Sequence, residues 1–485
     1  MKKLLRWLMA LAVAMVAFVG VAAQPVHATD DSLAKIKAKG TLVMGTSPDY
    51  APYEFLVNKN GKNQVVGIDV EIAKKIASDL GVKLVVKQMD FDSLLVGLET
   101  HKVDMVLSAM TPTSARKQSV DFSQIYYTAS QDIIVNKADA KLYKNAESFV
   151  GKKVGAQTGS MQADLVKQKM TDSKLLGLTK VTDLILALKS HKVEGVVAEH
   201  PVAQAYVDHD KQLAIVKSGW TLDPESNGQA IGFAKGSDTL VAAANKSINE
   251  IKKQGLIKSY TKTAGDYMTK NTANTSMFHY WKFFAKGVEY TLLITAVSVV
   301  FGVLIGTLMA LMRLGKNKIL HTIAVAYIEF VRGTPLMIQV MFVYFGIGLF
   351  VDVPALTAGI IAVSLNSAAY VAEIIRSGID SIPTGQTEAA RSLGLSTRQT
   401  MTSVVLPQAI RNIWPALGNE FISLIKESSI VSIIGVTDLI YQLKVVQTAT
   451  YKGVAPIFVA MVIYFVLTFT LSKILGHFER KMQHD

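Results

Sequence analysis

The C-terminal part of this chain contains four long stretches that carry no Asp, Glu, Lys or Arg. These are residues 290–312, 333–351, 353–372 and 453–472. A helix needs about 20 apolar residues to cross the hydrocarbon core of a membrane, so each stretch predicts a membrane span. A fifth stretch, residues 416–436, contains Glu420, Lys426 and Glu427, and charges at membrane depth are costly unless they are paired or face a cavity. We include it because the topology requires it.

The predicted topology places the N-terminal half outside the membrane and the C-terminus inside. The five predicted helices cover about residues 288–312, 321–350 with a bend near Pro335, 354–377, the 416–436 region and 454–475. Basic residues concentrate on the cytoplasmic side of membrane proteins. Here they follow the first and last helices and bracket the segment 380–411: Arg313, Lys316, Lys318, Arg376, Arg391, Arg398, Arg411, Lys473, Arg480 and Lys481. The two outer turns carry Asp352 and Asp438 with only Lys444 and Lys452, so the charge bias agrees with the topology.

The N-terminus has the features of a secretory signal. Basic residues at positions 2, 3 and 6 precede an apolar run from Trp7 to Ala23, and small residues come next. This order predicts a signal peptide over residues 1–28, with an uncleaved anchor helix as the alternative; either one exports the region after it. The chain has no cysteine, which excludes disulfides, thiolate metal sites, cysteine nucleophiles and a lipid anchor on an N-terminal cysteine.

Residues 29–268 have the pattern of an exported α/β unit. Apolar β-rich runs alternate with helical patterns, as in residues 41–44, 68–80, 84–87, 91–99, 103–107 and 133–135, and this alternation predicts parallel sheets covered by helices. One pattern occurs twice: residues 94–104 and 184–194 both contain a short apolar helix, a His-Lys turn and a buried strand. Either the similarity is chance, or the unit has two similar lobes with a ligand cleft at the carboxyl ends of their strands.

Four motifs in this region occur together in one known family. They are residues 46–55 (Thr-Ser-Pro-Asp-Tyr-Ala-Pro-Tyr-Glu-Phe), 66–70 (Val-Gly-Ile-Asp-Val), 108–117 (Ser-Ala-Met-Thr-Pro-Thr-Ser-Ala-Arg-Lys) and 121–127 (Asp-Phe-Ser-Gln-Ile-Tyr-Tyr). With these motifs, residues 40–268 resemble the polar-amino-acid periplasmic binding proteins of ABC importers. The resemblance implies a type II, two-lobed α/β fold that closes on a ligand, with crossing strands near 127–136 and 227–234.

A free amino acid offers a carboxylate and an ammonium group, and each needs a charged partner. The resemblance assigns the carboxylate to Arg116, with further contacts from Ser108, Ala109 and Thr111. A solvated helix-end charge is the alternative for Arg116. The resemblance assigns the ammonium to Glu199, which could instead be a surface acid.

Aromatic and polar residues are expected to surround the substrate side chain. Tyr50 and Phe91 stand where glutamine-binding members of the family place aromatic side chains, although Phe91 also fits plain core packing. Gln157 and Ser160 resemble the ligand contacts that the family takes from its second lobe.

Residue 47 bears on the choice of substrate. Members of the family that bind basic amino acids commonly carry Asp there, and this chain has Ser47. Asp49 could replace that charge, depending on where its carboxylate points. We therefore expect a neutral polar substrate, glutamine first, with a basic amino acid as the next candidate.

The segment after the third predicted span contains the most specific motif. Glu388-Ala-Ala, three residues, Gly394, nine residues and Val404-Val-Leu-Pro407 match the spacing of the EAA loop of ABC importer permeases, with Val404 in place of Ile. Residues 285–478 resemble these permeases. We expect a short helix that starts near Thr387, turns at Gly394 and ends by Pro407. The resemblance assigns one set of residues in the cytoplasmic loop 380–410 to contact with an ATPase subunit: Glu388, Ala389, Ala390, Gly394 and Pro407.

Other classes of function have little support. No Gly-x-x-x-x-Gly-Lys-Ser/Thr segment occurs, so the chain lacks the phosphate-binding loop of an ATPase. Its His residues show no metal-ligand spacing and no Ser/His/Asp set stands out, so we expect no metal, no cofactor and no enzymatic activity. The net charge of +13 reflects membrane topology and a basic exported surface rather than nucleic-acid binding.

These predictions combine into one architecture. A signal peptide (1–28) precedes an extracellular binding domain (29–268), a polar linker (269–285) and a transmembrane permease domain (286–485). We expect a plasma-membrane importer subunit for a small polar amino acid, working as a homodimer with two ATPase subunits. The alternative is an amino-acid-gated channel or receptor, but no Thr-Val-Gly-Tyr-Gly filter is present. Within the predicted spans, Glu329 and Arg332 are three residues apart and could pair.

Overall fold

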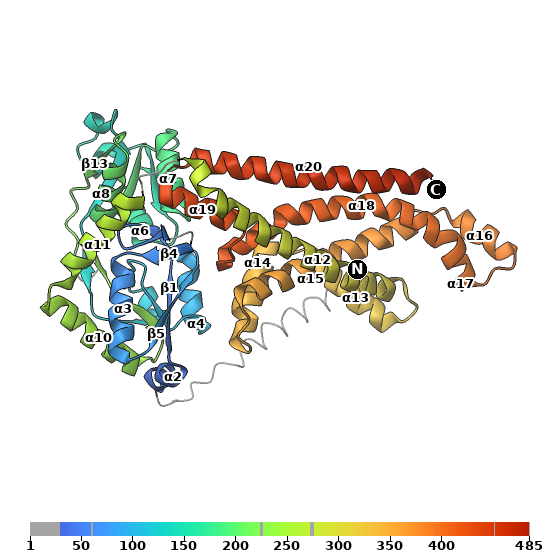
Figure 1. The fold of residues 1–485 in the computed structure, drawn as a ribbon, viewed down its shortest axis with the longest axis horizontal. Coiled ribbons are helices and arrows are strands. Elements are labelled where there is room, and N and C mark those ends of the chain that lie inside the picture. Colours follow the sequence, from blue (N-terminus) through green and yellow to red (C-terminus); the bar gives the residue numbers. More distant parts are fainter. Residues whose placement is uncertain (1–29, 60–61, 224–226, 272–275, 451, 485) are drawn as a thin grey trace.

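The computed structural model describes residues 30–484 except 60–61, 224–226, 272–275 and 451. Two sheet-containing lobes lie at one end of the molecule, and long helices extend away from them (Figure 1). The signal peptide predicted over residues 1–28 lies outside the described residues.

The first lobe is built on a five-stranded sheet with the order β5-β1-β6-β15-β7. Its strands are β1 (Thr41–Thr46), β5 (Lys83–Gln88), β6 (Met105–Val106), β7 (Val120–Phe122) and β15 (Gly232–Ala234). β1 pairs in parallel with β5 and β6, whereas β15 is antiparallel to both of its neighbours. The helices α3 (Ile68–Leu80), α4 (Leu94–Glu99), α10 (Asp238–Lys253) and α11 (Leu256–Asn271) accompany this sheet. α3 buries Ile68, Ile72 and Ile76, a spacing of four that gives the helix one apolar face.

The second lobe repeats this plan with the strand order β11-β10-β12-β9-β13. Its strands are β9 (Gln131–Asn136), β10 (Lys153–Gln157), β11 (Lys174–Leu178), β12 (Gly195–Glu199) and β13 (Leu213–Lys217). Its helices include α6 (Met161–Lys169), α7 (Val181–Lys189) and α8 (His200–His209). A short antiparallel pair, β8 (Tyr127–Thr128) with β14 (Gly228–Gln229), lies where the chain passes between the lobes. The two-lobed fold and the predicted crossing segments near 127–136 and 227–234 are therefore confirmed.

The repeated sequence pattern forms the same local structure twice. In each copy a short helix, α4 or α7, is followed by a turn in which His101 or His191 adopts a positive φ of 53°. The next residue closes the turn in both copies: the Lys102 N–H donates to the Gly97 carbonyl at 2.9 Å, and the Lys192 N–H donates to the Ala187 carbonyl at 2.8 Å. The two segments are therefore similar in backbone structure as well as in sequence.

The C-terminal part is helical. Its main helices are α12 (Trp281–Leu314), α13 (Lys318–Arg332), α14 (Leu336–Met341), α15 (Ala355–Asp380), α18 (Leu406–Glu427), α19 (Leu439–Thr450) and α20 (Val454–His484). Within the described residues, three helices are long and apolar enough to span a membrane, and the number rises to five if each of two bent helix pairs is one span. Of the segment 269–285, predicted as a linker, residues 269–271 end α11, 277–280 form η4 (Met277–Tyr280) and 281–285 begin α12, whereas residues 272–275 lie outside the described residues.

One expectation from the sequence is confirmed for this part and one is wrong. The bend predicted near Pro335 is present, and the chain turns there by 107° between α13 and α14. The break falls at Pro335, which precedes α14, and a proline disfavours helical backbone in the residue before it. The region predicted as an outer turn between Asp438 and Lys452 forms helix α19, most of which is buried. A helix buried on nearly all sides has no polar face to reveal it in the sequence.

Candidate functional site

The residues predicted to bind a ligand gather where the two lobes meet. Tyr50, Phe91, Ser108, Ala109 and Thr111 are buried in the first lobe, and Gln157, Ser160 and Glu199 are buried in the second. Arg116 begins the short helix α5 (Arg116–Ser119) of the first lobe and is half-buried. The lobes touch across this region, so the structure is a closed form of the pair.

Arg116 connects the two lobes directly. Its Nη1 donates to the Thr111 carbonyl at 2.7 Å in the first lobe, and its Nη2 donates to the Gly159 carbonyl at 2.8 Å in the second. Its guanidinium lies 5.4 Å from the centre of the Phe91 ring. Burial lowers the pKa of Arg116 to about 10, which leaves the group charged at neutral pH. It is thus a fixed cation that can receive a carboxylate.

Two buried acids hold the loop that carries Ser108 and Ala109. Ala109 has a positive φ of 45°, and its N–H donates to Asp69 Oδ2 at 2.8 Å. Ser108 Oγ donates to Glu54 Oε1 at 2.9 Å. Burial raises the pKa of Asp69 to about 6, and burial together with the nearby Asp69 charge raises the pKa of Glu54 well above its ordinary value. Glu54 and Asp69 were given no role from the sequence, although each is an acid within an otherwise apolar run.

Glu199 ends strand β12 and is 1% exposed. Its Oε2 accepts a hydrogen bond from the Gln229 amide. Burial raises the pKa of Glu199 to about 8, against the opposing effect of the hydrogen bond from Gln229. The carboxyl group is therefore largely protonated near neutral pH in this structure, and a nearby ammonium would favour its ionised form.

The remaining predicted contacts serve local structure in this closed form. Ser160 Oγ accepts from the Ala163 N–H at 3.2 Å and caps α6. Gln157 Nε2 donates to the Thr179 carbonyl at 3.1 Å. Tyr50 stacks on Tyr53 with ring centres 5.9 Å apart.

Gln162, which no sequence motif singles out, donates from Nε2 to the Tyr50 hydroxyl at 3.4 Å and so links the lobes.

A buried lysine provides a further link that the sequence did not reveal. Lys180, directly before α7, places its Nζ 2.9 Å from Asp90 Oδ1 and 3.5 Å from Asp49 Oδ1, and donates to Ser47 Oγ at 3.0 Å. Asp49 also accepts from the Val181 N–H at 3.1 Å. The Asp49 carboxylate, whose direction the sequence left open, therefore points at a cation of the protein itself. Its partner lies far away in the chain, so no local pattern could identify the pair.

The site has the chemistry of a zwitterion receptor. It combines a half-buried guanidinium, a buried carboxyl group and aromatic rings, which are complementary to a carboxylate, an ammonium group and a side chain. In the part of the chain that the structure describes, no group of three or more His, Cys, Asp or Glu is arranged to hold a metal ion.

The predicted ATPase contact lies at the far end of the molecule. Helix α16 (Thr384–Ser392) and α17 (Thr397–Thr400) project at the opposite end from the two lobes (Figure 1). Glu388, Ala389 and Gly394 are exposed, whereas Ala390 is buried. Gly394 follows the end of α16 with a positive φ of 83°, an angle that glycine adopts freely at such positions.

Two details of that prediction are corrected. The helix starts at Thr384 after Pro383, so Glu388 lies in its second turn and not at its start. Pro407 does not end the coupling segment: it stands at the start of α18, after the π-turn Met401–Val405. Proline is tolerated at a helix start because its missing N–H would have no partner there.

An ion-pair cluster joins helices near the same end. The Glu373 carboxylate receives Arg313 at 2.6 Å and Arg376 at 2.5 Å, and Arg332 lies 3.9 Å away. Arg332 thus approaches Glu373 and not Glu329, its suggested neighbour on α13. Spacing along one helix could not reveal a partner supplied by another helix.

Comparison with known proteins matches both parts of the chain. Residues 42–265 match the family described as "Bacterial extracellular solute-binding proteins, family 3", and residues 302–484 match "Binding-protein-dependent transport system inner membrane component". The arginine-binding extracellular protein ArtP of Bacillus subtilis is 35% identical over 262 residues, covering 53% of this chain and 96% of ArtP.

Permeases match the C-terminal part. The arginine transport system permease protein ArtQ of Bacillus subtilis is 41% identical over 205 residues, covering 42% of this chain and 94% of ArtQ. A protein named as a glutamine transport system permease, GlnP, of Rickettsia felis is 40% identical over 202 residues, covering 41% of this chain and 93% of that protein.

Fold, site and similarity define a class of transport protein that captures a solute outside and carries it through a membrane. The chain belongs to the family 3 solute-binding proteins and to the binding-protein-dependent transport permeases, joined in one polypeptide. It is an amino-acid ABC importer component, and the channel or receptor alternative is not supported. A permease of this family works in the membrane with an ATPase partner.

Proposed function

We propose that the cleft between the lobes binds one polar L-amino acid. Arg116 would receive its carboxylate, with the Ser108–Thr111 loop alongside, and Glu199 would receive its ammonium group. Tyr50 and Phe91 would enclose its side chain, with Gln157 and Ser160 contributing from the second lobe. The observation that carries this proposal is the placement of a half-buried guanidinium and a buried carboxyl group on opposite lobes of one closed interface.

Glutamine is the favoured substrate. Ser47 places no charge at the position where the resemblance would put one for a basic substrate. The nearby carboxylates of Asp49 and Asp90 already face Lys180, so a cationic side chain would compete with a built-in ammonium. Arginine is the second candidate, because the similar protein ArtP is named for arginine binding.

We further propose the finer organisation of the importer. The binding domain (29–268) lies outside, the permease domain (286–485) spans the membrane five times, and the C-terminus lies inside. Support comes from the separation of the lobes and α16 to opposite ends of the molecule (Figure 1) and from the basic residues Arg391 and Arg398 near α16. Two chains would form one pathway, with one ATPase subunit under each α16.

The proposed cycle starts when ligand draws the lobes together. Closing of the lobes completes the docking of the domain on the outer face of the permease, and closure of the ATPase pair moves α16 and switches the pathway from inward-open to outward-open. Leu393, which is 84% exposed at the end of α16, offers an apolar contact for a groove in such a partner.

The test is calorimetric titration of the full chain in nanodiscs with each of the twenty amino acids, followed by uptake in proteoliposomes containing the ATPase. The proposal expects one strong polar ligand, saturable binding and ATP-dependent uptake of the same compound. Absence of binding by every amino acid would refute the assigned site, and tight binding of arginine without glutamine would refute the substrate preference.

A further inference from the structure

The first lobe inserts one buried lysine into the permease. Lys102, in the His-Lys turn after α4, has a side chain that is 1% exposed, and its Nζ lies 2.9 Å from Asp352 Oδ1. The same ammonium donates to the Val353 carbonyl at 3.3 Å and lies 5.0 Å from the centre of the Tyr344 ring. Gly348 leaves room for the lysine, because a Cβ there would overlap Lys102 Cε.

These four permease residues, Tyr344, Gly348, Asp352 and Val353, form what we call the lysine socket. A buried ammonium is unfavourable unless an opposite charge and hydrogen-bond acceptors surround it, and the socket provides both together with an aromatic face. Val96, on the same helix-turn unit, packs against a buried apolar cluster of the permease. The first lobe is therefore held by specific contacts.

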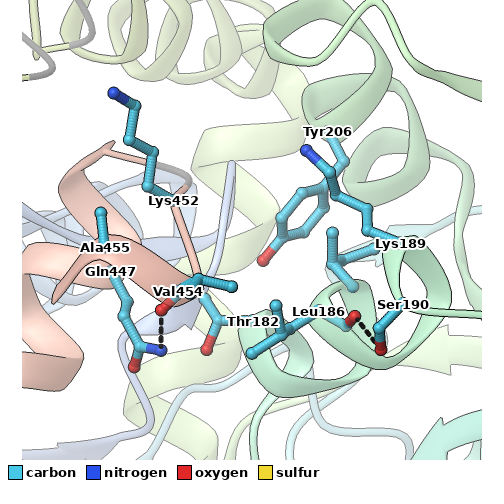
Figure 2. A pocket seen from close by; sticks show the side chains of 11 residues that line it. Thr182, Leu186, Lys189, Ser190, Tyr206, Gln447, Lys452, Val454 and Ala455 are labelled. Carbon is cyan, nitrogen blue, oxygen red and sulfur yellow. Dashed lines mark hydrogen bonds between the residues drawn. The ribbon is translucent and has the colours of Figure 1, made fainter. Parts of the chain in front are cut away.

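The second lobe meets the permease differently. Lys192 occupies the position of Lys102 in the repeated unit and is exposed. Leu186, the counterpart of Val96, faces Gly453 before α20, and a cavity of about 440 Å³ remains between α7 and the α19–α20 turn. Figure 2 shows Thr182 and Leu186 of α7 on one side of this cavity and Gln447 and Val454 on the other.

Helix α19 also contacts the first lobe close to the junction of the lobes. The Tyr441 hydroxyl donates to Gln88 Oε1, and Lys444 Nζ lies 3.9 Å from Asp90 Oδ2. Asp90 is also the closest carboxylate partner of Lys180 from the second lobe. One carboxylate is thus shared by both lobes and the permease.

We propose that the lysine socket anchors the first lobe to the permease through Lys102, so that the first lobe stays fixed while the second lobe moves against α19 and α20 as ligand binds and leaves. This inference rests on the proposed function and adds that the two lobes have different roles, the first in attachment to the permease and the second in movement. Closure of the second lobe would reach the permease where Lys180 of the second lobe and Lys444 of α19 both approach Asp90 of the first lobe.

The first experiment compares Lys102→Gln with the matched control Lys192→Gln in the full chain reconstituted with its ATPase. Lys102→Gln removes the ion pair between the buried Lys102 ammonium and the exposed Asp352 carboxylate, which should reduce uptake about tenfold with ligand affinity unchanged. Lys192→Gln should behave as wild type. Equal uptake by both variants, or weakened ligand binding in Lys102→Gln, would overturn the anchoring role.

The second experiment uses the absence of native cysteine. Lys102→Cys/Asp352→Cys, joined by a short bismaleimide, should recover most of the uptake that the unlinked pair loses, because a fixed first lobe is compatible with transport. Leu186→Cys/Gly453→Cys should form a disulfide, because a Cβ on Gly453 would lie 3.1 Å from Leu186 Cβ, and should stop uptake until it is reduced.

Loss of uptake in the crosslinked first-lobe variant, or continued uptake with the second lobe crosslinked, would overturn the inference. The two levels of hypothesis remain distinguishable. If the wild-type chain takes up no amino acid, the proposed function fails; if it does so and the lysine variants or crosslinks give these contrary results, only the anchoring inference fails.

Discussion

The two copies of the helix-turn-strand unit, residues 94–104 and 184–194, share a backbone but not a role. Both turn through a histidine at φ 53° and continue into a buried strand. In the first lobe the following lysine is buried against the permease, and in the second lobe it faces solvent. Local sequence thus sets the shape of the unit, and the surface against which it packs sets what the unit does.

The largest expected effect is a loss of ligand affinity in a variant of the first lobe. It tests whether the lobe that contacts the permease through Lys102 also binds the ligand carboxylate. Arg116→Ala removes the guanidinium that bridges to the second lobe, and affinity for the amino acid should fall by about a thousandfold because the charged partner of the ligand carboxylate is lost. Calorimetry on the full chain measures the change. The adjacent exposed Lys117→Ala is the control and should bind normally; retained binding by Arg116→Ala would remove the carboxylate assignment.

The next effect concerns the opposite end of the molecule from the lobes. Glu388→Lys reverses an exposed charge on α16, so uptake should fall to background while ligand affinity stays unchanged. An uptake assay measures transport, and calorimetry on the same reconstituted sample measures ligand affinity. Gln386→Lys, two residues earlier on the same helix and also exposed, is the comparison for a general effect of added charge. Normal uptake by Glu388→Lys would exclude this residue from the ATPase contact.

A smaller effect concerns the acid of the second lobe. The pKa of Glu199 in the folded chain is raised from 4.5 to about 8. Between these two pH values the folded chain therefore binds more protons than the unfolded chain. The free energy of unfolding of the ligand-free protein should fall as the pH rises through that window. At pH 8, Glu199→Gln should raise the free energy of unfolding by about 2–4 kcal/mol and abolish ligand binding.

Thermal unfolding without ligand, at pH 5 and pH 8, measures that difference. Asp69 and Glu54 titrate in both proteins, so the difference between wild type and Glu199→Gln reports on Glu199. An unchanged pH dependence in the variant would contradict the raised pKa of the buried Glu199 carboxyl group.

The smallest effect tests whether the two turns are locally equivalent. His101→Gly and His191→Gly each relieve a positive φ that a side chain adopts at a cost, and each should stabilise the chain by about 0.5 kcal/mol after the greater flexibility of unfolded glycine is subtracted. Denaturant unfolding of both variants measures this. If one variant raised the free energy of unfolding and the other lowered it, the two turns would differ in stability because of the residues packed around them.

Much of the fold was accessible from the sequence because its signals are local. Alternating β-rich and helical patterns predicted the α/β lobes, and the repeated His-Lys segment indicated two similar lobes as one of two alternatives. The bend near Pro335 was predicted without its angle, and helix α19 was not predicted, since the angle at a break and the burial of a helix on all sides depend on neighbouring elements.

The candidate site divides in the same way. Arg116 and Tyr50 stand in motifs that can be found in the sequence, and the family resemblance pointed to Glu199. Lys180 with Asp90, and Lys102 with Asp352, pair residues that are far apart in the chain. The Glu54–Asp69 support beneath Ser108 and Ala109 was also hidden, because its importance follows from burial.

The sequence by itself determined the division into an α/β part and an apolar helical part and the turn at Gly394. These follow from hydrophobic periodicity, charge distribution and backbone preference, which act over a few residues. The residues proposed for the cleft and for the ATPase contact were found through the family resemblance. Only the tertiary structure decided which of two similar lysines is buried, where the Asp49 carboxylate points and which arginines surround Glu373. Burial and ion pairing depend on distance in space, and the fold alone brings those distant residues together.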